Sequence, residues 1–438
     1  MFPNPQDALP LPRRPDLEQY RKLAKELVRS ADAGEAAVRA WATRWVTALV
    51  QQSGIVITET LPVRIDGWSK RVGDYAMREL IEKGTATLAK AQFVIARSHG
   101  FESWPKFAAH LRQLAEAKAH TSPFEAAADA IVNGDAATLD RLLREHPDLV
   151  RARSVREHGA TLLHYTSANG VEGYRQKTPA NIVGITKMLL DAGADVDATC
   201  HVYASDCTTL GLTATSVHPA NAGVMNDLLQ LLLDRGAAMD KEGSAGRSHS
   251  LVFACLANGQ PDAARFLASR GARVDFVSAA ALGDLAAVRE RFSPDGSGKP
   301  PVSKELLQEA YRYACGYGAA SVVEFLLERG ADMSEHTGDG YTGTHYAVMS
   351  GSVETVTLLL RRHPPLEGKT THGRSVLFHA LWSATRGQDL QAHVEIITAL
   401  IEAGAEVPER HPPVNPTIDA LLERHGSRAD PDWRWSAG

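Results

Sequence analysis

The sequence predicts an all-α fold, a solenoid of about eight stacked helix pairs with short β-hairpin fingers and an N-terminal helical cap region. The first observation behind this prediction is a self-similar segment that returns after about 33 residues. The second is the dipeptide that closes each Leu-rich stretch, which is Gly-Ala at positions 193, 236, 271, 330 and 404 and His-Pro at positions 146 and 363. The third is the helical spacing of apolar residues ahead of the repeats.

The N-terminal region, residues 1–120, does not carry the repeat and is expected to be helical. From Asp16 to Val28 the apolar residues stand three and four apart, which is the spacing of an amphipathic helix. A second helix is expected from Ala36 to Val50, with Trp41 and Trp45 four residues apart on one face.

The rest of this region gives one ambiguous segment and one clear helix pair. Apolar residues alternate from Gly54 to Gly67 as they do in a strand, but Pro62 disfavours that assignment. Leu88 to Leu114 reads as two helices, because Gly100 ends the first and Pro105 opens the second. Since a solenoid needs an end cap with one polar face, we interpret this region as a cap rather than a catalytic domain.

The repeats are expected in residues 121–410, and the segment Asp339 to Leu360 is their clearest copy. It has a turn, a helix that starts with a short polar motif, a Gly that ends this helix and a Leu-rich second helix. It resembles an ankyrin repeat, whose first helix begins Thr-Pro-Leu-His. The four slots of that motif are filled here by Thr342, Gly343, Thr344 and His345.

Departures from the period predict where loops are inserted or lost. Three repeats carry extra residues between their two helices, around positions 171–180, 218–222 and 386–391. The helix pair from Phe276 to Phe292 has no hairpin sequence ahead of it, so one finger is expected to be missing. Residues 411–438 follow the repeats, and a helix from Thr417 to His425 is expected to cap that end.

A second resemblance lies in the N-terminal region. The segment from Ala91 to Pro105 is similar to one found in bacterial ankyrin proteins, in which an Ala-Gln-x-x-Ile-Ala-Arg helix meets a Gly-Phe-x-Ser-Trp-Pro turn. The resemblance implies a bacterial type of ankyrin protein and no particular activity.

Composition excludes several classes of function. With 47 basic and 52 acidic residues the net charge is −5, and no segment gathers Lys and Arg as a duplex-binding face does, so nucleic acid is not expected as a partner. The N-terminus lacks the features of a secretion signal, and no stretch reaches membrane-spanning length. Cys255 and Cys315 are expected to be small buried side chains in a reduced cytoplasm.

The resemblance implies a structural role for two histidines. His164 and His345 occupy the last slot of the helix-start motif, whose ring commonly forms hydrogen bonds within and between neighbouring turns. We therefore do not count them among the candidate binding residues.

The resemblance to ankyrin repeats implies that the residue after that histidine faces the concave groove. The same is implied for the position one helical turn further along. Large side chains fill these slots at Tyr165, Tyr313, Tyr317, Tyr346, His379 and Trp382. Tyr and Trp are enriched at binding hot spots, so we expect these residues to contact a partner. Packing of the rings on one another within the array is the alternative.

A second candidate surface is the finger within Thr199 to His218. This segment is several residues longer than the short turn that ankyrin repeats usually have at this position. Tyr203, Asp206 and His218 are its candidate binding residues. The residues of this segment whose side chains could bind a metal are Cys200, His201, Asp206, Cys207 and His218. Their spacing matches no zinc pattern, so neither a metal nor another cofactor is expected.

No catalytic motif stands out. The segment 295–300 looks like a phosphate loop, but Ser293 replaces its first Gly and Pro300 its last hydroxyl residue. The sequence therefore favours a cytoplasmic protein-protein interaction module that holds a partner in the concave groove and by its hairpin fingers. The alternative is an enzyme or a small-molecule-binding protein, with a pocket that the long inserts build from Tyr165, His201, Asp206, His218 and His379.

Overall fold

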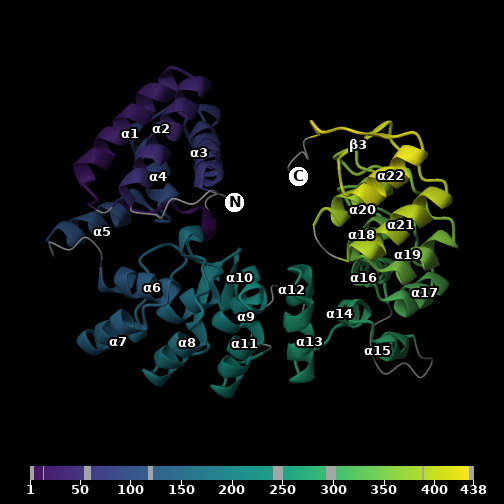
Figure 1. Cartoon of the computed structure of the whole chain (residues 1–438). Helices are drawn as coiled ribbons and strands as arrows, with labels where there is room; N and C mark the ends of the chain where they lie inside the picture. The colour runs from purple at the N-terminus through teal and green to yellow at the C-terminus, as the bar shows by residue number, and fades with distance from the viewer. Residues whose placement is uncertain are drawn as a thin grey trace. The chain divides into compact units, whose positions relative to one another are not determined.

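The computed structural model describes residues 4–12, 14–53, 61–116, 122–239, 250–292, 302–386 and 389–433. The chain forms two compact units, Met1–Ala272 and Arg273–Gly438 (Figure 1). The phosphate-loop-like segment, Gly387 and Gln388 lie outside the described residues. Because each unit has its own set of internal contacts, the units are described separately.

The first unit begins with a helical region around an aromatic core. It contains η1 (Pro5–Asp7), α1 (Leu17–Asp32), α2 (Glu35–Ser53), α3 (Leu61–Met77), a π-helical turn η2 (Arg78–Glu82), α4 (Leu88–Ser98) and α5 (Trp104–Glu116). The helix starts follow from their caps, since Asp16 accepts a hydrogen bond from the Glu18 amide and Thr87 accepts one from the Lys90 amide. Trp41, Ile95 and Phe107 are buried in the core between these helices.

Helix α3 corrects the one ambiguous part of the sequence analysis. Residues 54–60 are not described, but from Leu61 onward the chain is helical through Met77. Val72 and Ala76 of this helix are buried, four residues apart, against α2. The second half of the alternation, from Leu61 to Gly67, therefore lies in a helix, and Pro62 is tolerated there because the first turn of a helix needs no amide donor.

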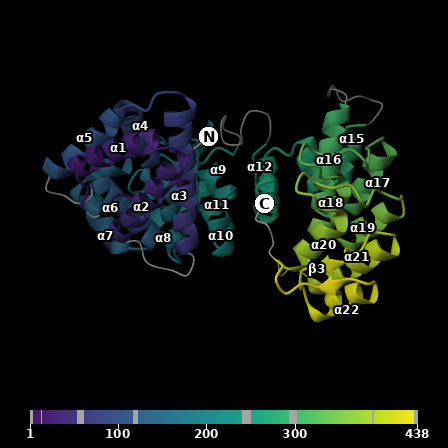
Figure 2. The same ribbon diagram turned by 90° about the horizontal axis from the view of Figure 1, so that it is seen from above.

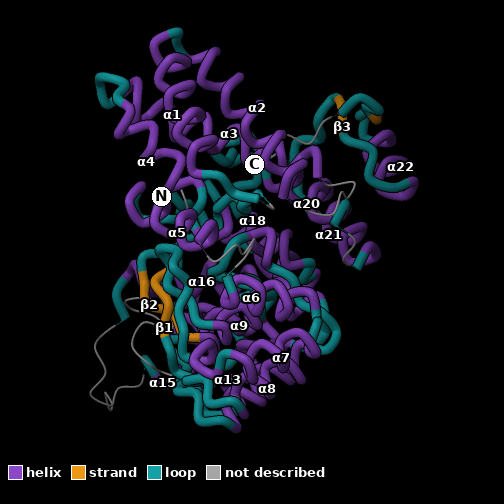
Figure 3. The backbone as a smooth tube through the Cα atoms, turned by 90° about the vertical axis from the view of Figure 1, so that its left-hand side faces the viewer, coloured by secondary structure: helices purple, strands orange, loops and turns teal. Residues whose placement is uncertain are grey.

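The first unit continues with helix pairs. Their elements are α6 (Pro123–Asn133), α7 (Ala136–Glu145), η3 (Pro147–Val150), η4 (Leu162–Ser167), η5 (Gly173–Arg175), α8 (Ile182–Asp191), β1 (Thr199–Val202), β2 (Ser205–Thr208), α9 (Thr209–Ala214), α10 (Val217–Asn221), α11 (Met225–Asp234), α12 (Leu251–Ala257) and α13 (Pro261–Ser269). The first helices α6, η4, α9 and α12 pack in series, and so do the second helices α8, α11 and α13. Strands β1 and β2 form an antiparallel finger (Figure 3).

The second unit repeats this arrangement. It contains α14 (Phe276–Ala281), α15 (Leu285–Glu290), α16 (Lys304–Gly316), α17 (Ala320–Glu328), α18 (Gly343–Ser350), α19 (Val353–Leu360), α20 (Val376–Ala384), α21 (Leu390–Glu402), β3 (Arg410–His411), α22 (Pro416–Arg424) and β4 (Arg428–Ala429). Helices α14, α16, α18 and α20 pack in series, with α15, α17, α19 and α21 as a second row (Figure 2). The expected C-terminal helix is α22, and the short parallel pair β3–β4 beside it was not expected.

A hydroxyl residue starts most of the first helices of these pairs. Ser122, Thr208, Ser250, Ser303 and Ser375 each accept a hydrogen bond from the backbone amide three residues later. These side chains satisfy amides that the helix itself leaves unpaired. The recurring Ser or Thr of the sequence pattern is therefore a helix cap, and this fixes where each pair begins.

Not every helix or finger has the expected form. The first helix of the second pair, η4, is a 3-10 helix that ends at Ala168 in a left-handed conformation with φ of 49°. The predicted insert at 171–180 contains η5, and the insert at 218–222 overlaps α10. Residues 270–275 contain no strand, and neither do the segments 331–342 and 361–375, so the expected loss of a finger ahead of α14 stays a prediction.

Candidate interaction sites

The β1–β2 finger is held by a tight turn with unusual backbone angles. Val202 pairs with Ser205, and the two turn residues have positive φ values, 54° at Tyr203 and 59° at Ala204. Two-residue hairpin turns with two positive φ values usually carry Asn and Gly, since a side chain with a Cβ is strained there. The turn places Tyr203 at the tip of the finger, where it is 47% exposed.

A pocket of about 620 Å³ lies beside the finger, and we call it the finger pocket. Two of the predicted binding residues, Tyr203 and His218, line it. The other lining residues come from the finger, the inserts, the helix ends and the N-terminus, and they are Gln6, Ala168, Asn169, Gln176, Ser205, Cys207, Gly211, Leu212, Thr215, Ser216, Val217, Ala254 and Asn258.

Hydrogen bonds through Asn169 join the parts of the finger pocket. The Tyr203 hydroxyl donates to Asn169 Oδ1 at 2.7 Å. The Asn169 amide donates in turn to the Leu212 carbonyl at 3.2 Å and to Thr215 Oγ1 at 3.1 Å. The finger, the segment after η4 and the helix α9 are thus positioned together, so the pocket shape does not depend on a single loop.

The lining of the finger pocket is electrically neutral near pH 7. None of its described lining residues is Lys, Arg, Asp or Glu. Burial lowers the pKa of His218, which keeps the imidazole neutral. Burial also raises the pKa of the Cys207 thiol to about 11. The rim is partly apolar, because Val217 is 50% exposed beside Tyr203.

Asp206 lies on the other face of the finger. Its carboxylate contacts His201 Nδ1 at 2.9 Å, with both side chains open to solvent. The alternation along the strands buries Cys200 opposite this pair. The five potential metal-ligating residues of this segment are therefore not all on one side of the finger. Within the described ranges, no three His, Cys, Asp or Glu side chains lie close enough together to hold a metal ion.

In the second unit, four of the predicted aromatic residues are partly exposed, and we call this set the aromatic face. Tyr313 lies on α16, Tyr317 caps the C-terminus of α16, Tyr346 lies on α18 and Trp382 on α20, and all four are half-buried. The three helices pack in series, so these positions follow one another along the row. The Arg386 guanidinium stacks over the Trp382 ring at 4.3 Å from the ring centre, so the face combines a cation with aromatic area.

Two of the predicted residues are inside the protein. Tyr165 is fully buried beneath Arg175, with the guanidinium 5.7 Å from its ring centre. His379 is 2% exposed, and its ring lies 5.0 Å from that of Tyr341. Both occupy the groove slot in sequence, but neighbouring side chains cover them. We therefore exclude both from the exposed candidate surfaces.

The histidines with an expected structural role have it. His164 Nδ1 accepts a hydrogen bond from the Thr161 amide at 3.1 Å, and its Nε2 contacts the Cys207 carbonyl at 3.3 Å. His345 Nδ1 accepts in the same way from the Thr342 amide at 3.1 Å. The cysteines Cys255 and Cys315 are buried, also as expected, and burial raises the pKa of each to about 12.

Sequence reasoning missed several polar residues of the finger pocket. Asn169 precedes the predicted insert at 171–180 and Gln176 lies within it, so the insert itself was a signal for them. Gln6 is brought to the pocket by the N-terminal segment, and no sequence pattern indicated that. Its neighbour in space is Gly173, because a Cβ on Gly173 would lie 2.5 Å from the Gln6 carbonyl oxygen.

Comparisons with known proteins place ankyrin repeats in this chain. Residues 312–411 match the family model of ankyrin repeats, in three copies. The match runs from the C-terminal part of α16 to β3 and includes the four residues of the aromatic face. A crystal structure of the human ASB11 ankyrin repeat domain is similar at 18% identity and a TM-score of 0.33, over 65% of this chain and 99% of that one. No curated protein matches the chain.

None of the helices within the described ranges has both the length and the apolar character that a membrane crossing requires. Ankyrin repeats generally serve as protein-protein interaction modules.

Proposed function

We propose that this chain is a protein-binding scaffold with two separate candidate binding surfaces, the finger pocket of its first unit and the aromatic face of its second. The presence of ankyrin repeats supports the class of function. A preformed repeat surface loses little conformational entropy on docking, which favours recognition of another protein.

The observation that carries the proposal is the composition of the finger pocket and its rim. Tyr203 and Val217 are among the most exposed large hydrophobic side chains of the described residues, and both border the same pocket. Exposed apolar side chains around a hollow are typical of a protein interaction site. Because the lining is neutral, the partner segment that enters is uncharged and contributes hydrogen-bonding groups.

No reaction is assigned to this pocket. A nucleophilic cysteine needs a lowered pKa, whereas the Cys207 pKa is raised. Asp206, a possible carboxylate partner for a histidine, pairs with His201 and does not line the pocket. The free cysteines fit a reducing compartment, and we propose that the partner is met in the cytoplasm.

The proposal can be tested by proximity crosslinking of the full chain in native cytosol, with quantitative comparison of the proteins captured. Tyr203→Ala should deplete the specific partner by about tenfold, since hot-spot aromatic residues contribute about 1.4 kcal/mol or more. Trp382→Ala tests the aromatic face in the same way. Phe93→Ala removes an exposed aromatic side chain from α4 and is the matched control.

Capture that is the same for Tyr203→Ala, Trp382→Ala and Phe93→Ala would rule out both surfaces. Loss of captured partner with Tyr203→Ala alone would assign binding to the first unit, and loss with Trp382→Ala alone would assign it to the second.

A further inference from the structure

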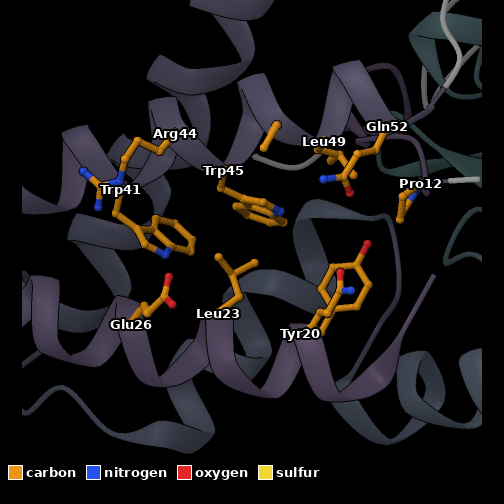
Figure 4. A pocket seen from close by; sticks show the side chains of 11 residues that line it. Pro12, Tyr20, Leu23, Glu26, Trp41, Arg44, Trp45, Leu49 and Gln52 are labelled. Carbon is orange, nitrogen blue, oxygen red and sulfur yellow. The ribbon is translucent and has the colours of Figure 1, made fainter. Parts of the chain in front are cut away.

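A second pocket lies between α1 and α2 of the N-terminal helical region (Figure 4). Its volume is about 260 Å³. The lining residues come from these two helices and from the preceding segment, and they are Pro12, Gln19, Tyr20, Leu23, Glu26, Trp41, Arg44, Trp45, Ala48, Leu49 and Gln52. We call it the interhelix pocket. It has no lining residue in common with the finger pocket.

The centre of the interhelix pocket is apolar and aromatic. Leu23 and Leu49 lie on facing helices, with Trp45 between them in Figure 4. The rings of Trp41 and Trp45 are 5.1 Å apart between centres and inclined by 41°. Large planar side chains at this separation form a wall against which another flat ring can pack.

Two buried polar atoms of this pocket have no hydrogen-bond partner among the described residues. They are the Tyr20 hydroxyl and Trp41 Nε1, on side chains that are 5% and 1% exposed. An unsatisfied buried donor costs about 1–3 kcal/mol, and Phe or Leu at either position would fill the same space without that cost. The two donors therefore call for an explanation beyond packing of the core.

The two donors point to different ends of the pocket. In Figure 4 the Tyr20 hydroxyl is directed toward the end formed by Pro12 and Gln52. The Trp41 ring nitrogen is directed toward the end where Glu26 and Arg44 lie. An occupant that satisfies both donors needs an acceptor at each end and an apolar middle.

The charged side chains of the pocket stay at its rim. Glu26 and Arg44 are exposed to solvent, so their opposite charges remain hydrated. Between the two ends the walls carry no charged side chain among the described lining residues. An ionised group inside would lose its hydration without gaining a partner, which favours a neutral occupant.

We propose that the interhelix pocket binds a small neutral planar aromatic molecule, of one or two rings, that carries a hydrogen-bond acceptor at each end. The volume is just below the usual range for ligand sites, about 300–1,000 Å³, which limits the ligand to this size. Because neither donor atom is open to water, the exposed side chains at the two ends, Gln52 at the Tyr20 end and Glu26 at the Trp41 end, turn outward when the ligand enters. This site is independent of the partner surfaces proposed above.

The probe for this proposal is 7-methoxycoumarin, a neutral two-ring molecule with acceptor oxygens at both ends. Titration into the full chain, followed by quenching of tryptophan fluorescence and by calorimetry, should show saturable binding at one site. Tyr20→Phe and Trp41→Phe should each weaken binding by about fivefold to tenfold, the effect of losing one hydrogen bond. Ala48→Phe, which fills the exposed rim of the pocket, should weaken it by more than about tenfold.

The matched control is Tyr75→Phe, which removes a hydroxyl from the same helical region but not from the pocket. It should leave the affinity unchanged. Each variant is checked by its thermal midpoint, so that a loss of binding is not a loss of folding. Absence of saturable binding to the wild-type chain, or equal binding to the wild type and the folded Ala48→Phe variant, would overturn the proposal.

Discussion

Gly343 stands in the slot that holds Pro in the ankyrin pattern, and the structure gives the physical reason. A Cβ on Gly343 would lie 2.4 Å from Tyr311 Cε1 and 2.6 Å from its hydroxyl oxygen. Tyr311 is fully buried in α16, so its ring cannot move aside. The preceding repeat has thus placed a large ring where the usual proline would be, and only glycine fits.

This contact predicts a strong effect of one methyl group. Gly343→Ala should lower the free energy of unfolding by about 1–3 kcal/mol, because it overpacks the contact with Tyr311. Urea denaturation measures the change. Gly338→Ala is the control, since nothing lies within 4 Å of the added methyl group there. In a Tyr311→Leu background the Gly343→Ala effect should shrink by more than about 0.5 kcal/mol, and strict additivity would contradict the contact.

His379 predicts a pH dependence. Burial, followed by the nearby charges of His345 and Arg374, lowers the pKa of His379 to about 4. Unfolding returns it to its ordinary value of about 6.5, so the unfolded chain binds more protons between these values. The stability contributed by the neutral imidazole is therefore complete above about pH 6.5 and is lost as the pH falls toward 4.

The variant His379→Phe should remove this part of the acid sensitivity. The difference in unfolding free energy between pH 7 and pH 5 should be smaller in the variant by about 1–2 kcal/mol. Urea denaturation at the two pH values measures it. Burial also lowers the pKa of His164 to about 4, so some pH dependence of the unfolding free energy should remain in both proteins. An unchanged pH dependence would show that His379 is already hydrated in the folded chain.

At the scale of elements, a buried charge cluster joins the N-terminal helical region to the repeats. Arg175 of η5 contacts Glu125 of α6 at 2.6 Å and Asp129 at 2.8 Å. Arg156 contacts Glu172 at 2.5 Å, and it donates a hydrogen bond to the carbonyl of His99 at the end of α4. The insert at 171–180 therefore supplies Glu172 and Arg175 to ion pairs with Arg156 and Glu125 that are almost completely shielded from water, whereas Asp129 is half exposed.

The same cluster explains the turn between α4 and α5. Gly100 has φ of 79°, and the Glu157 amide donates to its carbonyl at 2.8 Å. Phe101 is buried, with the Arg156 guanidinium 5.6 Å from its ring centre. The Gly100–Phe101 pair is thus a contact point of the N-terminal helical region with the segment that holds Arg156 and Glu157.

Removal of one cation should disrupt this junction. Burial by itself would raise the pKa of Glu125, but Arg175 and Arg156 hold it below its ordinary value. Arg175→Met leaves Glu125 without its closest partner and should lower the free energy of unfolding of the first unit by about 3–5 kcal/mol. Arg141→Met, which breaks only the exposed Arg141–Glu145 pair, should cost about 0.5 kcal/mol or less. Comparable losses in the two variants would contradict a stabilising role for the cluster.

At the scale of the whole molecule, stability is expected to be local. Within each unit the helix pairs pack mainly on their neighbours in sequence, and the units have separate internal contacts. In such arrays a destabilised repeat unfolds locally together with the adjacent repeats, while distant repeats stay folded.

Hydrogen exchange can detect this locality. Gly343→Ala should raise amide exchange in α16, α18 and α20 and leave α1 and α2 at the wild-type rate. Arg175→Met should instead raise amide exchange in α6 and η5 of the first unit. Exchange in the second unit should stay at the wild-type rate. A uniform rise across both units would show instead that the chain unfolds as a single cooperative body.

The sequence alone determined the local structure of this protein, because periodic glycines, hydroxyl caps and apolar spacing act within one or two turns of the chain. The helix pairs, the finger at Thr199–Thr208 and the structural role of His164 were predictable for this reason. Burial of Tyr165 and His379, and the close approach of Gln6 to Gly173, depend on residues far apart in sequence. Only the tertiary structure decides those, since which side chain covers another is set by packing between elements and not by position within a repeat.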